Sequence, residues 1–145
     1  MSLDGPYDPG NIFAKIVRGE APRILVHEDD DVLAFMDVFP QADGHVLVVP
    51  KASCARNILE MDAATLQKMI VAVQRIASAI RAALQPDGIL VAQLNGMAAG
   101  QTVDHFHFHI IPCWSGQPIR GEGIREKADI DELLALATKI AALRR

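Results

Sequence analysis

Apolar residues recur every three or four positions over a long central stretch of the chain. The stretch follows Asp62 and ends near Pro86-Asp87-Gly88, and its apolar positions are Leu66, Met69, Ile70, Val73, Ile76, Ala77, Ile80, Ala83 and Leu84. This spacing places them on one side of a helix and the intervening positions on the other. The pattern predicts an amphipathic helix of about six turns that Asp62 caps.

Two further helices are indicated by residues that suit helix ends. Residues 11–18 predict a short helix, which begins with a capping asparagine and is ended by Gly19. Its apolar face is Ile12, Phe13, Ile16 and Val17. Asp129 and Glu132 have the spacing of a capping box, which predicts a last helix that runs through Leu143.

Five short apolar runs predict strands. They are Ile24–Val26, Val32–Met36, Val46–Val49, which Pro50 closes, Ile89–Leu94, and His105–Ile111, which ends at Pro112. The order of these elements predicts the α+β class, an antiparallel sheet with the long amphipathic helix and a C-terminal helix on one side. The chain shows no repeat or linker, so we expect a single domain over 1–145, with a core at about 11–114 and a C-terminal tail and helix at 115–145.

The composition limits the class of protein. Half of the 145 residues are apolar and 22% are charged, which is ordinary for a folded domain. The net charge of −4 without a basic stripe argues against nucleic-acid binding, and no apolar run approaches the roughly 20 residues that cross a membrane. The two cysteines, Cys54 and Cys113, lack a CxxC spacing, and residues 1–6 lack the features of a secretory signal. We therefore expect a cytoplasmic protein with free cysteines.

The segment 102–112 carries three of the five histidines of the chain, at alternate positions. Because side chains alternate between the faces of a strand, His105, His107 and His109 are predicted to project from one face. The residues on the other face, which we expect to fill the core, are Phe106, Phe108 and Ile110.

Three interpretations of this row of histidines stay open on the residues alone. It can be an exposed polar face of a strand, although protonated imidazoles about 7 Å apart repel each other. It can bind a metal ion, with His45 or Asp104 as a further ligand. It can serve covalent catalysis, because a neutral imidazole attacks phosphorus when its other nitrogen donates a hydrogen bond that fixes the tautomer.

The segment just before the histidines favours covalent catalysis. Residues 95–102 read Asn-Gly-Met-Ala-Ala-Gly-Gln-Thr, and the two glycines allow the backbone to approach a ligand closely. Gln101 and Thr102 offer hydrogen-bond donors to phosphate oxygens or to a leaving group. Such a loop alone is usually a hairpin connection, but its direct junction with the histidine segment favours a phosphate site.

With these residues the chain resembles the histidine triad (HIT) family, whose signature is His-φ-His-φ-His-φ-φ with φ apolar. Residues 105–111 read His-Phe-His-Phe-His-Ile-Ile and match the signature at every position. The segments 35–41, 44–51 and 100–103 also resemble family segments and occur in the family order, so the resemblance extends from about residue 11 to 114. It implies a HIT-like fold of the Hint-like or bacterial branch.

The resemblance also implies roles for single residues. His107 would form a nucleotidyl-histidine intermediate that water hydrolyses, and His109 would bind the phosphate. His105 and His45 would support these histidines, and Thr102 would assist the leaving group. The implied nucleotide-binding residues are Asp37 for the ribose hydroxyls, Asn95 and Gln101 beside the phosphate, and Ile12, Phe13, Ile16, Phe35 and Val38 as the apolar nucleoside pocket.

The activity that the resemblance implies is hydrolysis or transfer at the α-phosphate of purine nucleoside 5′-phosphoramidates or related nucleotide conjugates, by a homodimer that needs no cofactor. The alternatives are a dinucleoside polyphosphate hydrolase and a non-catalytic nucleotide-binding or scaffold protein. The third histidine of the motif argues against the uridylyltransferase branch, which has glutamine there. Some bacterial relatives bind zinc through positions that read Asn11, Ala14 and Ser53 here, so we expect no metal.

Overall fold

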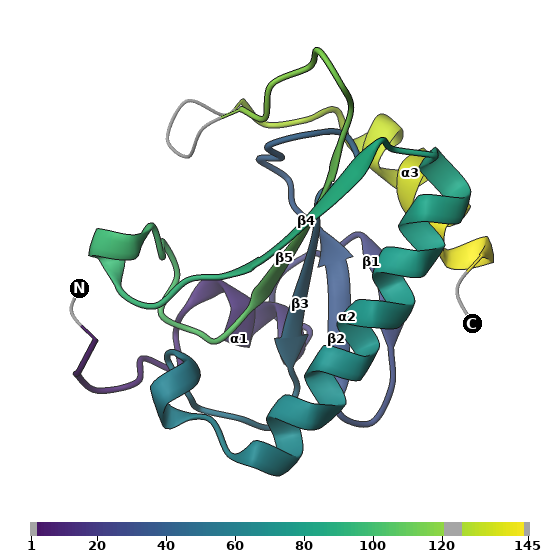
Figure 1. The fold of residues 1–145 in the computed structure, drawn as a ribbon. Coiled ribbons are helices and arrows are strands. Elements are labelled where there is room, and N and C mark those ends of the chain that lie inside the picture. Colours follow the sequence, from purple (N-terminus) through teal and green to yellow (C-terminus); the bar gives the residue numbers. More distant parts are fainter. Residues whose placement is uncertain (1–2, 121–125, 144–145) are drawn as a thin grey trace.

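Five antiparallel strands form the central layer of the protein (Figure 1). The structure is a computed structural model that describes residues 3–120 and 126–143, so the expected domain limits at residues 1 and 145 lie outside the described part. The strands are β1 (Leu25–Glu28), β2 (Val32–Met36), β3 (Val46–Pro50), β4 (Gly88–Gln93) and β5 (Phe108–Cys113). Their order across the sheet is β1-β2-β3-β5-β4, and every neighbouring pair is antiparallel. The predicted α+β class is confirmed.

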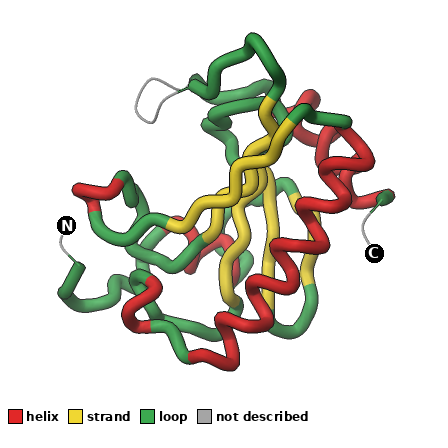
Figure 2. The backbone as a smooth tube through the Cα atoms, viewed as in Figure 1, coloured by secondary structure: helices red, strands yellow, loops and turns green. Residues whose placement is uncertain are grey.

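Helices cover both faces of the sheet (Figure 2). α2 (Ala63–Leu84) and α3 (Ile130–Ala142) pack on one face, and α1 (Ile12–Val17) packs on the other. Along β2, alternate side chains contribute to the two cores, with Ala34 facing α2 and Phe35 facing α1. Because both faces are covered, every residue of β2 and β3 is buried.

The long helix agrees with its sequence pattern. The Asp62 carboxylate accepts a hydrogen bond from the main-chain N–H of Thr65 at 2.9 Å, which caps the first turn of α2. The buried face is made of Met69, Ala72, Val73, Ile76, Ala79, Ile80 and Ala83. After 22 residues the helix ends at Gln85, which adopts a left-handed conformation with φ of 52°.

The two shorter helices differ in how they begin. The Asn11 side chain accepts from the N–H of Ala14 at 2.9 Å, which confirms the predicted cap of α1. At α3 the predicted capping box is wrong, because the side chain of Asp129 makes no capping hydrogen bond. Instead the N–H of Ala128 donates to the carbonyl of Val38 at 2.9 Å, so a tertiary contact fixes the approach to the helix.

The strand predicted for His105–Ile111 is partly wrong. β5 begins only at Phe108 and runs through Pro112 to Cys113. Before it, the N–H of Phe106 donates to the carbonyl of Ala55, so this segment leaves the ladder with β3. The proline limits are also wrong, since Pro50 pairs with Val32 inside the sheet. Short 3-10 helices that the pattern did not predict lie at η1 (Ile58–Glu60) and η2 (Met97–Ala99).

No helix in the described part of the chain is long and apolar enough to cross a membrane. Both cysteines, Cys54 and Cys113, are free thiols.

Candidate active site

A row of side chains crosses the sheet on the side of α1. Phe35 of β2 lies opposite Leu47 of β3, and Leu47 lies opposite His109 of β5. Next to this row lies a cavity of about 620 Å³, which Phe13 of α1 also lines. Because these strands are neighbours, the cavity extends from the histidines across β3 to β2 and on to Ile24, just before β1.

His107 lines the histidine end of this cavity, just before β5. Its Nδ1 lies 2.6 Å from the main-chain oxygen of His105. A carbonyl oxygen only accepts, so Nδ1 carries the hydrogen and Nε2 of the neutral ring has a lone pair. The ring of His107 packs edge-on against Phe13 and His109, with centroids 4.8 and 4.9 Å away. Only 3% of the residue is exposed, so its orientation is fixed by packing.

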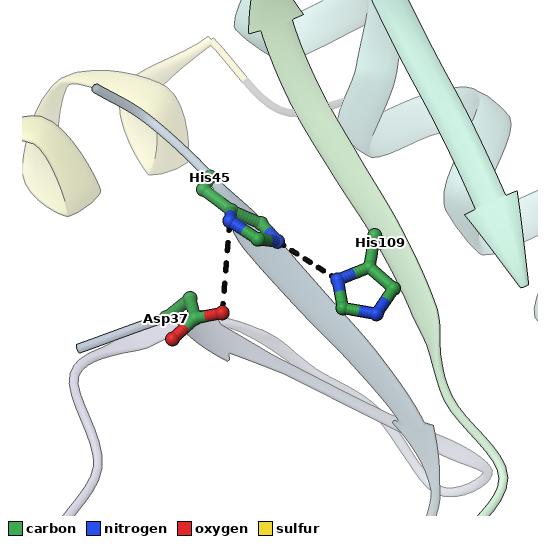
Figure 3. A group of neighbouring side chains, drawn as sticks. All are labelled: Asp37, His45 and His109. Carbon is green, nitrogen blue, oxygen red and sulfur yellow. Dashed lines mark hydrogen bonds and ion pairs between the residues drawn. The ribbon is translucent and has the colours of Figure 1, made fainter. Parts of the chain in front are cut away.

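His109 is oriented by His45, the residue just before β3 (Figure 3). The main-chain N–H of Gln41 donates to Nδ1 of His45 at 3.0 Å, so the neutral ring of His45 carries its hydrogen on Nε2. This Nε2 lies 2.9 Å from Nδ1 of His109 and donates to it. The neutral ring of His109 therefore carries its own hydrogen on Nε2. The result is an N–H donor on His109 beside the lone pair of His107.

Asp37 lies beside His45, next to these hydrogen bonds. One carboxylate oxygen accepts from the N–H of Phe39 at 2.8 Å, and the other lies 3.6 Å from Nδ1 of His45 (Figure 3). Asp37 is 8% exposed and lines the cavity. Among the described residues of the lining, it is the one with an acidic side chain, and it lies at the end of β2.

His105 lies behind His107 and is held by a residue from the N-terminal segment. The hydroxyl of Tyr7 lies 2.8 Å from Nδ1 of His105, and the two rings are 5.8 Å apart. Nε2 of His105 is buried without a hydrogen-bond partner of good geometry among the described residues. The nitrogen of a neutral imidazole is a better acceptor than a phenol oxygen, so Tyr7 donates to Nδ1 and the hydrogen of the His105 ring is on Nε2.

Burial keeps both histidines neutral near pH 7. Loss of hydration and, to a smaller extent, the neighbouring His107 lower the pKa of His105 to about 4, while the Pro50 carbonyl opposes the change. Burial also lowers the pKa of His107, and the hydrogen bond to the carbonyl of His105 opposes this. Both rings are neutral bases under physiological conditions, which is the form that a nucleophile needs.

Gln101 braces the loop before the histidines. Its side-chain oxygen accepts from the N–H of Gly96 at 2.7 Å, and its amide donates to the carbonyls of Arg56 and Val103 at 2.7 and 2.9 Å. The residue is 1% exposed. These bonds use both ends of the amide inside the loop, so the side chain shapes the loop rather than lining the cavity.

Two more interactions tie this loop to the segment after β3. The Asn95 side chain accepts from the N–H of Ile58 at 2.8 Å. Arg56 is 5% exposed and forms an ion pair of 2.9 Å with Asp104, the residue before His105. The histidine segment is therefore tied to the segment after β3 by a partly buried charge pair that no sequence motif indicated.

The structure gathers most of the predicted site residues around the cavity. Those that line it are Ile12, Phe13, Ile16, Phe35, Asp37, Val38, Thr102, His107 and His109. His45 and His105 lie behind this lining and contact it through hydrogen bonds to His109 and His107. Asn95 and Gln101 bond to neighbouring loops. The roles in binding and catalysis stay predictions.

Sequence reasoning missed Tyr7, Arg56 and the part of the lining that α3 supplies. Tyr7 lies in a segment of Gly, Pro and Asp without periodicity, and nothing in that segment signals a contact 98 positions away. Ile130 and Leu134, which also line the cavity, could have been noticed in the sequence. With them the apolar stripe of α3 is wider than packing against one face of the sheet requires.

A metal ion has one candidate site in the described part of the chain. Asp37, His45 and His109 each offer one ligand atom, and these atoms lie within 4.8 Å of one another. However, both ring nitrogens of His45 already take part in hydrogen bonds, to Gln41 and to His109. A metal ion bound to His45 would have to replace one of these hydrogen bonds. The geometry therefore fits imidazoles that are hydrogen-bonded to one another better than imidazoles that bind a metal ion. Asn11 and Ser53, which were not expected to bind zinc, take part in other contacts: Asn11 caps α1, and the Ser53 hydroxyl accepts from the N–H of Ala55.

Comparisons with known proteins agree with this geometry. The family model described as HIT domain matches residues 18–115. The crystal structure of a Hit-like protein involved in cell-cycle regulation from Bartonella henselae is 48% identical, with a TM-score of 0.90 over 96% of this chain and 99% of that one. A hypothetical histidine triad nucleotide-binding protein from Sulfolobus tokodaii is 30% identical, with a TM-score of 0.82 over 90% and 89% of the two chains.

Among the curated proteins, an adenylylsulfatase of Arabidopsis thaliana is 32% identical over 130 residues, which are 86% of this chain and 66% of that protein. The family model covers more than half of the chain, and the likeness to the solved structures spans nearly all of it. The chain belongs to the HIT family.

Proposed function

We propose that this protein hydrolyses nucleotide conjugates at the α-phosphate, with purine nucleoside 5′-phosphoramidates as substrates and His107 as the nucleophile. The observation that carries the proposal is the 2.6 Å hydrogen bond from Nδ1 of His107 to the carbonyl of His105. It holds the hydrogen on Nδ1 and leaves Nε2 as a base at the cavity. The lowered pKa of His107 keeps that lone pair available near pH 7.

The reaction has two steps. In the first, Nε2 of His107 bonds to phosphorus while the bond from phosphorus to the leaving group breaks. The leaving group takes up a proton from solvent, which the hydroxyl of Thr102, a residue of the cavity lining, would pass on by donating its own hydrogen. In the second, water attacks phosphorus and returns a proton to solvent, the bond to Nε2 breaks, and a nucleoside monophosphate leaves. The N–H of His109 stabilises the negative charge on the phosphoryl oxygens in both steps.

The rest of the nucleotide suits the remaining lining of the cavity. The carboxylate of Asp37 accepts hydrogen bonds from ribose hydroxyls, since it is the acidic group of the lining. The apolar side chains beyond it, among them Phe13 of α1 and Phe35 of β2, offer surfaces on which a flat base can stack. A cavity of about 620 Å³ is within the usual size of small-molecule sites.

Two relatives support this reading. The Sulfolobus tokodaii protein is named as nucleotide-binding, and the Arabidopsis thaliana protein as an adenylylsulfatase. An adenylyl sulfate carries its sulfate on the α-phosphate of a nucleotide, and loss of that sulfate by attack at phosphorus would be the same displacement as the one proposed here. A phosphoramidate differs from it only in the group that leaves.

The nucleophile is tested with His107→Ala and His107→Asn, of which the Asn side chain retains a donor for the carbonyl of His105. Both variants should lose turnover of adenosine 5′-phosphoramidate by about 10³-fold or more, and both should still bind AMP in calorimetry. The matched control is His27→Ala, because His27 lies outside the cavity and pairs with Asp29. Rapid quenching of the native enzyme should show a nucleotidyl group on the peptide that contains His107. Turnover that persists in both variants would remove His107 from this role.

The alternatives predict other results in the same assays. A dinucleoside polyphosphate hydrolase would show a higher kcat/KM for dinucleoside polyphosphates than for phosphoramidates. A scaffold protein would bind AMP without turning over either substrate. A metal enzyme would contain stoichiometric metal in elemental analysis and lose activity in chelator, whereas the proposed chemistry needs no metal and survives it.

We also propose that the protein is a cytoplasmic homodimer that pairs along β4. This strand lies at an edge of the sheet, so its outer main-chain groups face no other strand of the described part. It exposes Leu90 and Val91, at 43% and 42%, and α2 exposes Ile70 and Val71. A second copy would cover these apolar side chains and pair the edge.

A further inference from the structure

The C-terminal helix α3 has two apolar stripes with different neighbours. Leu133, Ala137 and Ile140 are at most 3% exposed and belong to the core under the sheet. Ile130 and Leu134, one turn apart, are 44% and 47% exposed and line the active-site cavity. The first stripe anchors the helix, so the second is held at the cavity without taking part in the packing of the core.

Hydrogen bonds tie the chain before α3 to the loop that follows β2. The N–H of Arg120 donates to the carbonyl of Gln41 at 2.8 Å, and its Nε donates to the carbonyl of Pro40 at 3.1 Å. The N–H of Ala128 donates to the carbonyl of Val38, itself a lining residue. These hydrogen bonds hold the chain at Arg120 and at Ala128, on the way into α3, and so fix the helix relative to the cavity.

Although α3 packs on the face of the sheet opposite α1, its residues Ile130 and Leu134 line the cavity together with Ile24, the residue just before β1. His107 and His109 are at β5, whereas α3 packs against β1 and β2 on the other side of β3. Asp37, at the end of β2, lies between these two ends. A nucleotide with its phosphorus at His107 and its ribose at Asp37 thus directs its base toward α3. The helix lies outside residues 18–115, which the family model matches, so this wall is an addition to the matched region.

We infer that Ile130 and Leu134 form the distal wall of the base site and set its preference for purines over pyrimidines. The inference rests on the proposed function and deepens it. Two aliphatic side chains contact a ring by its size and shape, because they offer no hydrogen bond. A purine has a second ring that reaches this wall, and a pyrimidine leaves a gap in front of it. A pyrimidine therefore buries less apolar area against this wall than a purine does, and it binds more weakly.

The test compares the native protein with the double variant Ile130→Ala/Leu134→Ala, using 5′-phosphoramidates of adenosine, guanosine, cytidine and uridine. The variant should lose about tenfold in kcat/KM for both purine compounds, since contacts of one or two methyl groups are worth that much in specificity. The pyrimidine compounds and ribose 5-phosphoramidate should be little affected, so the purine-to-pyrimidine ratio falls about tenfold. The matched control is Leu143→Ala, which truncates a side chain 44% exposed at the end of the same helix and outside the cavity lining.

Calorimetry with AMP and ribose 5-phosphate gives a second readout that needs no turnover. The native protein should bind AMP more tightly, and the double variant should lose most of this difference. A purine-to-pyrimidine ratio that is unchanged in the folded double variant would overturn the inference, as would an equal loss for ribose 5-phosphoramidate. If the native protein turns over none of the compounds, the proposed function fails, while the contrast between AMP and ribose 5-phosphate still tests the wall.

Discussion

Main-chain groups decide which ring nitrogens of the histidines carry hydrogen. The carbonyl of His105 can only accept, and the N–H of Gln41 can only donate. These two contacts place the hydrogen of His107 on Nδ1 and that of His45 on Nε2. Because neither main-chain group titrates, the tautomers are set by the fold and not by a neighbouring acid or base. The chemistry of the site thus depends on a few single contacts.

The buried histidines should make the folded protein less stable in acid. The unfolded chain protonates His105 near its ordinary pKa of 6.5, whereas the folded protein does so only at about 4. Between these values the unfolded state binds more protons, so the free energy of unfolding falls as the pH is lowered from 6.5 to 4. The loss from His105 amounts to about 3 kcal/mol, and His107 adds to it in the same direction. Urea denaturation at several pH values measures this.

His105→Gln is the control for that measurement. It removes the titrating ring, so the curve of stability against pH should become flatter than in the native protein. A native curve that is level from pH 7 to pH 4.5 would contradict the burial of two neutral histidines.

Tyr7 is a second residue whose contribution can be measured. Tyr7→Phe removes the hydroxyl that donates to Nδ1 of His105 at 2.8 Å and leaves a buried nitrogen without its partner. We expect a loss of about 1–3 kcal/mol in the free energy of unfolding, together with a lower kcat and a nearly unchanged KM. Urea denaturation and steady-state kinetics report the two effects. Equal stability of variant and native protein would show that water replaces the hydroxyl.

Between elements, the loop that leads into β3 is pressed against the end of α2 and the end of β5. Gly44, which precedes His45, has a φ of +87°. A Cβ at this position would clash with the side chain of Leu84 and lie 3.1 Å from Pro112. The packing of a helix end and a strand end thus fixes where His45 enters the site.

Gly44→Ala tests this contact between elements. We expect a loss of about 2 kcal/mol or more in stability, because both the positive φ and the close neighbours oppose a side chain. Turnover should fall as well, since His45 adjoins the displaced residue. The matched control is Gly88→Ala, because a Cβ at Gly88 meets no atom within 4 Å. Thermal denaturation of both variants separates the two cases, and equal melting temperatures would count against the packing argument.

For the whole molecule, the sheet has two edges, at β1 and β4, of which β4 exposes large apolar side chains in its middle. An exposed and unpaired edge of this kind favours association with a second chain. The active-site cavity lies across β2, β3 and β5, and although β5 is the strand next to β4, no residue of β4 is among the described residues that line the cavity. Dimerisation and chemistry should therefore be separable by mutation.

We expect Leu90→Lys to convert a dimer into a monomer, because it places a charge in the proposed contact. Sedimentation velocity gives the oligomeric state directly. Leu59→Lys is the control, since Leu59 of η1 is 70% exposed and lies outside β4 and α2. A native protein that sediments as a monomer at all concentrations would rule out the proposed pairing.

Local patterns predicted those elements whose residues interact mainly with near neighbours. The three-to-four spacing in α2 is the pattern of an amphipathic helix, and the continuous apolar run of β2 is typical of a strand buried on both faces, so both elements are visible in the chain itself. The start of β5 was predicted too early, because a hydrogen bond from Phe106 to Ala55, 51 positions away, takes the segment out of the sheet. The missing cap of α3 has the same origin, a contact with Val38.

The sequence by itself determined the number and type of the main elements and the presence of three histidines that can face one way, because periodicity and residue chemistry act over a few positions. Only the tertiary structure decided which nitrogen of each ring carries hydrogen, that Tyr7 and Arg56 support the site, and that α3 closes the cavity. The contacts of Tyr7, Arg56 and α3 join residues roughly 50 to 100 positions apart, and the free energy of such contacts leaves no pattern in the neighbouring residues. The tautomers depend on contacts only two and four positions apart, but the folded path of the backbone, and not the residue types, aims these groups at the rings.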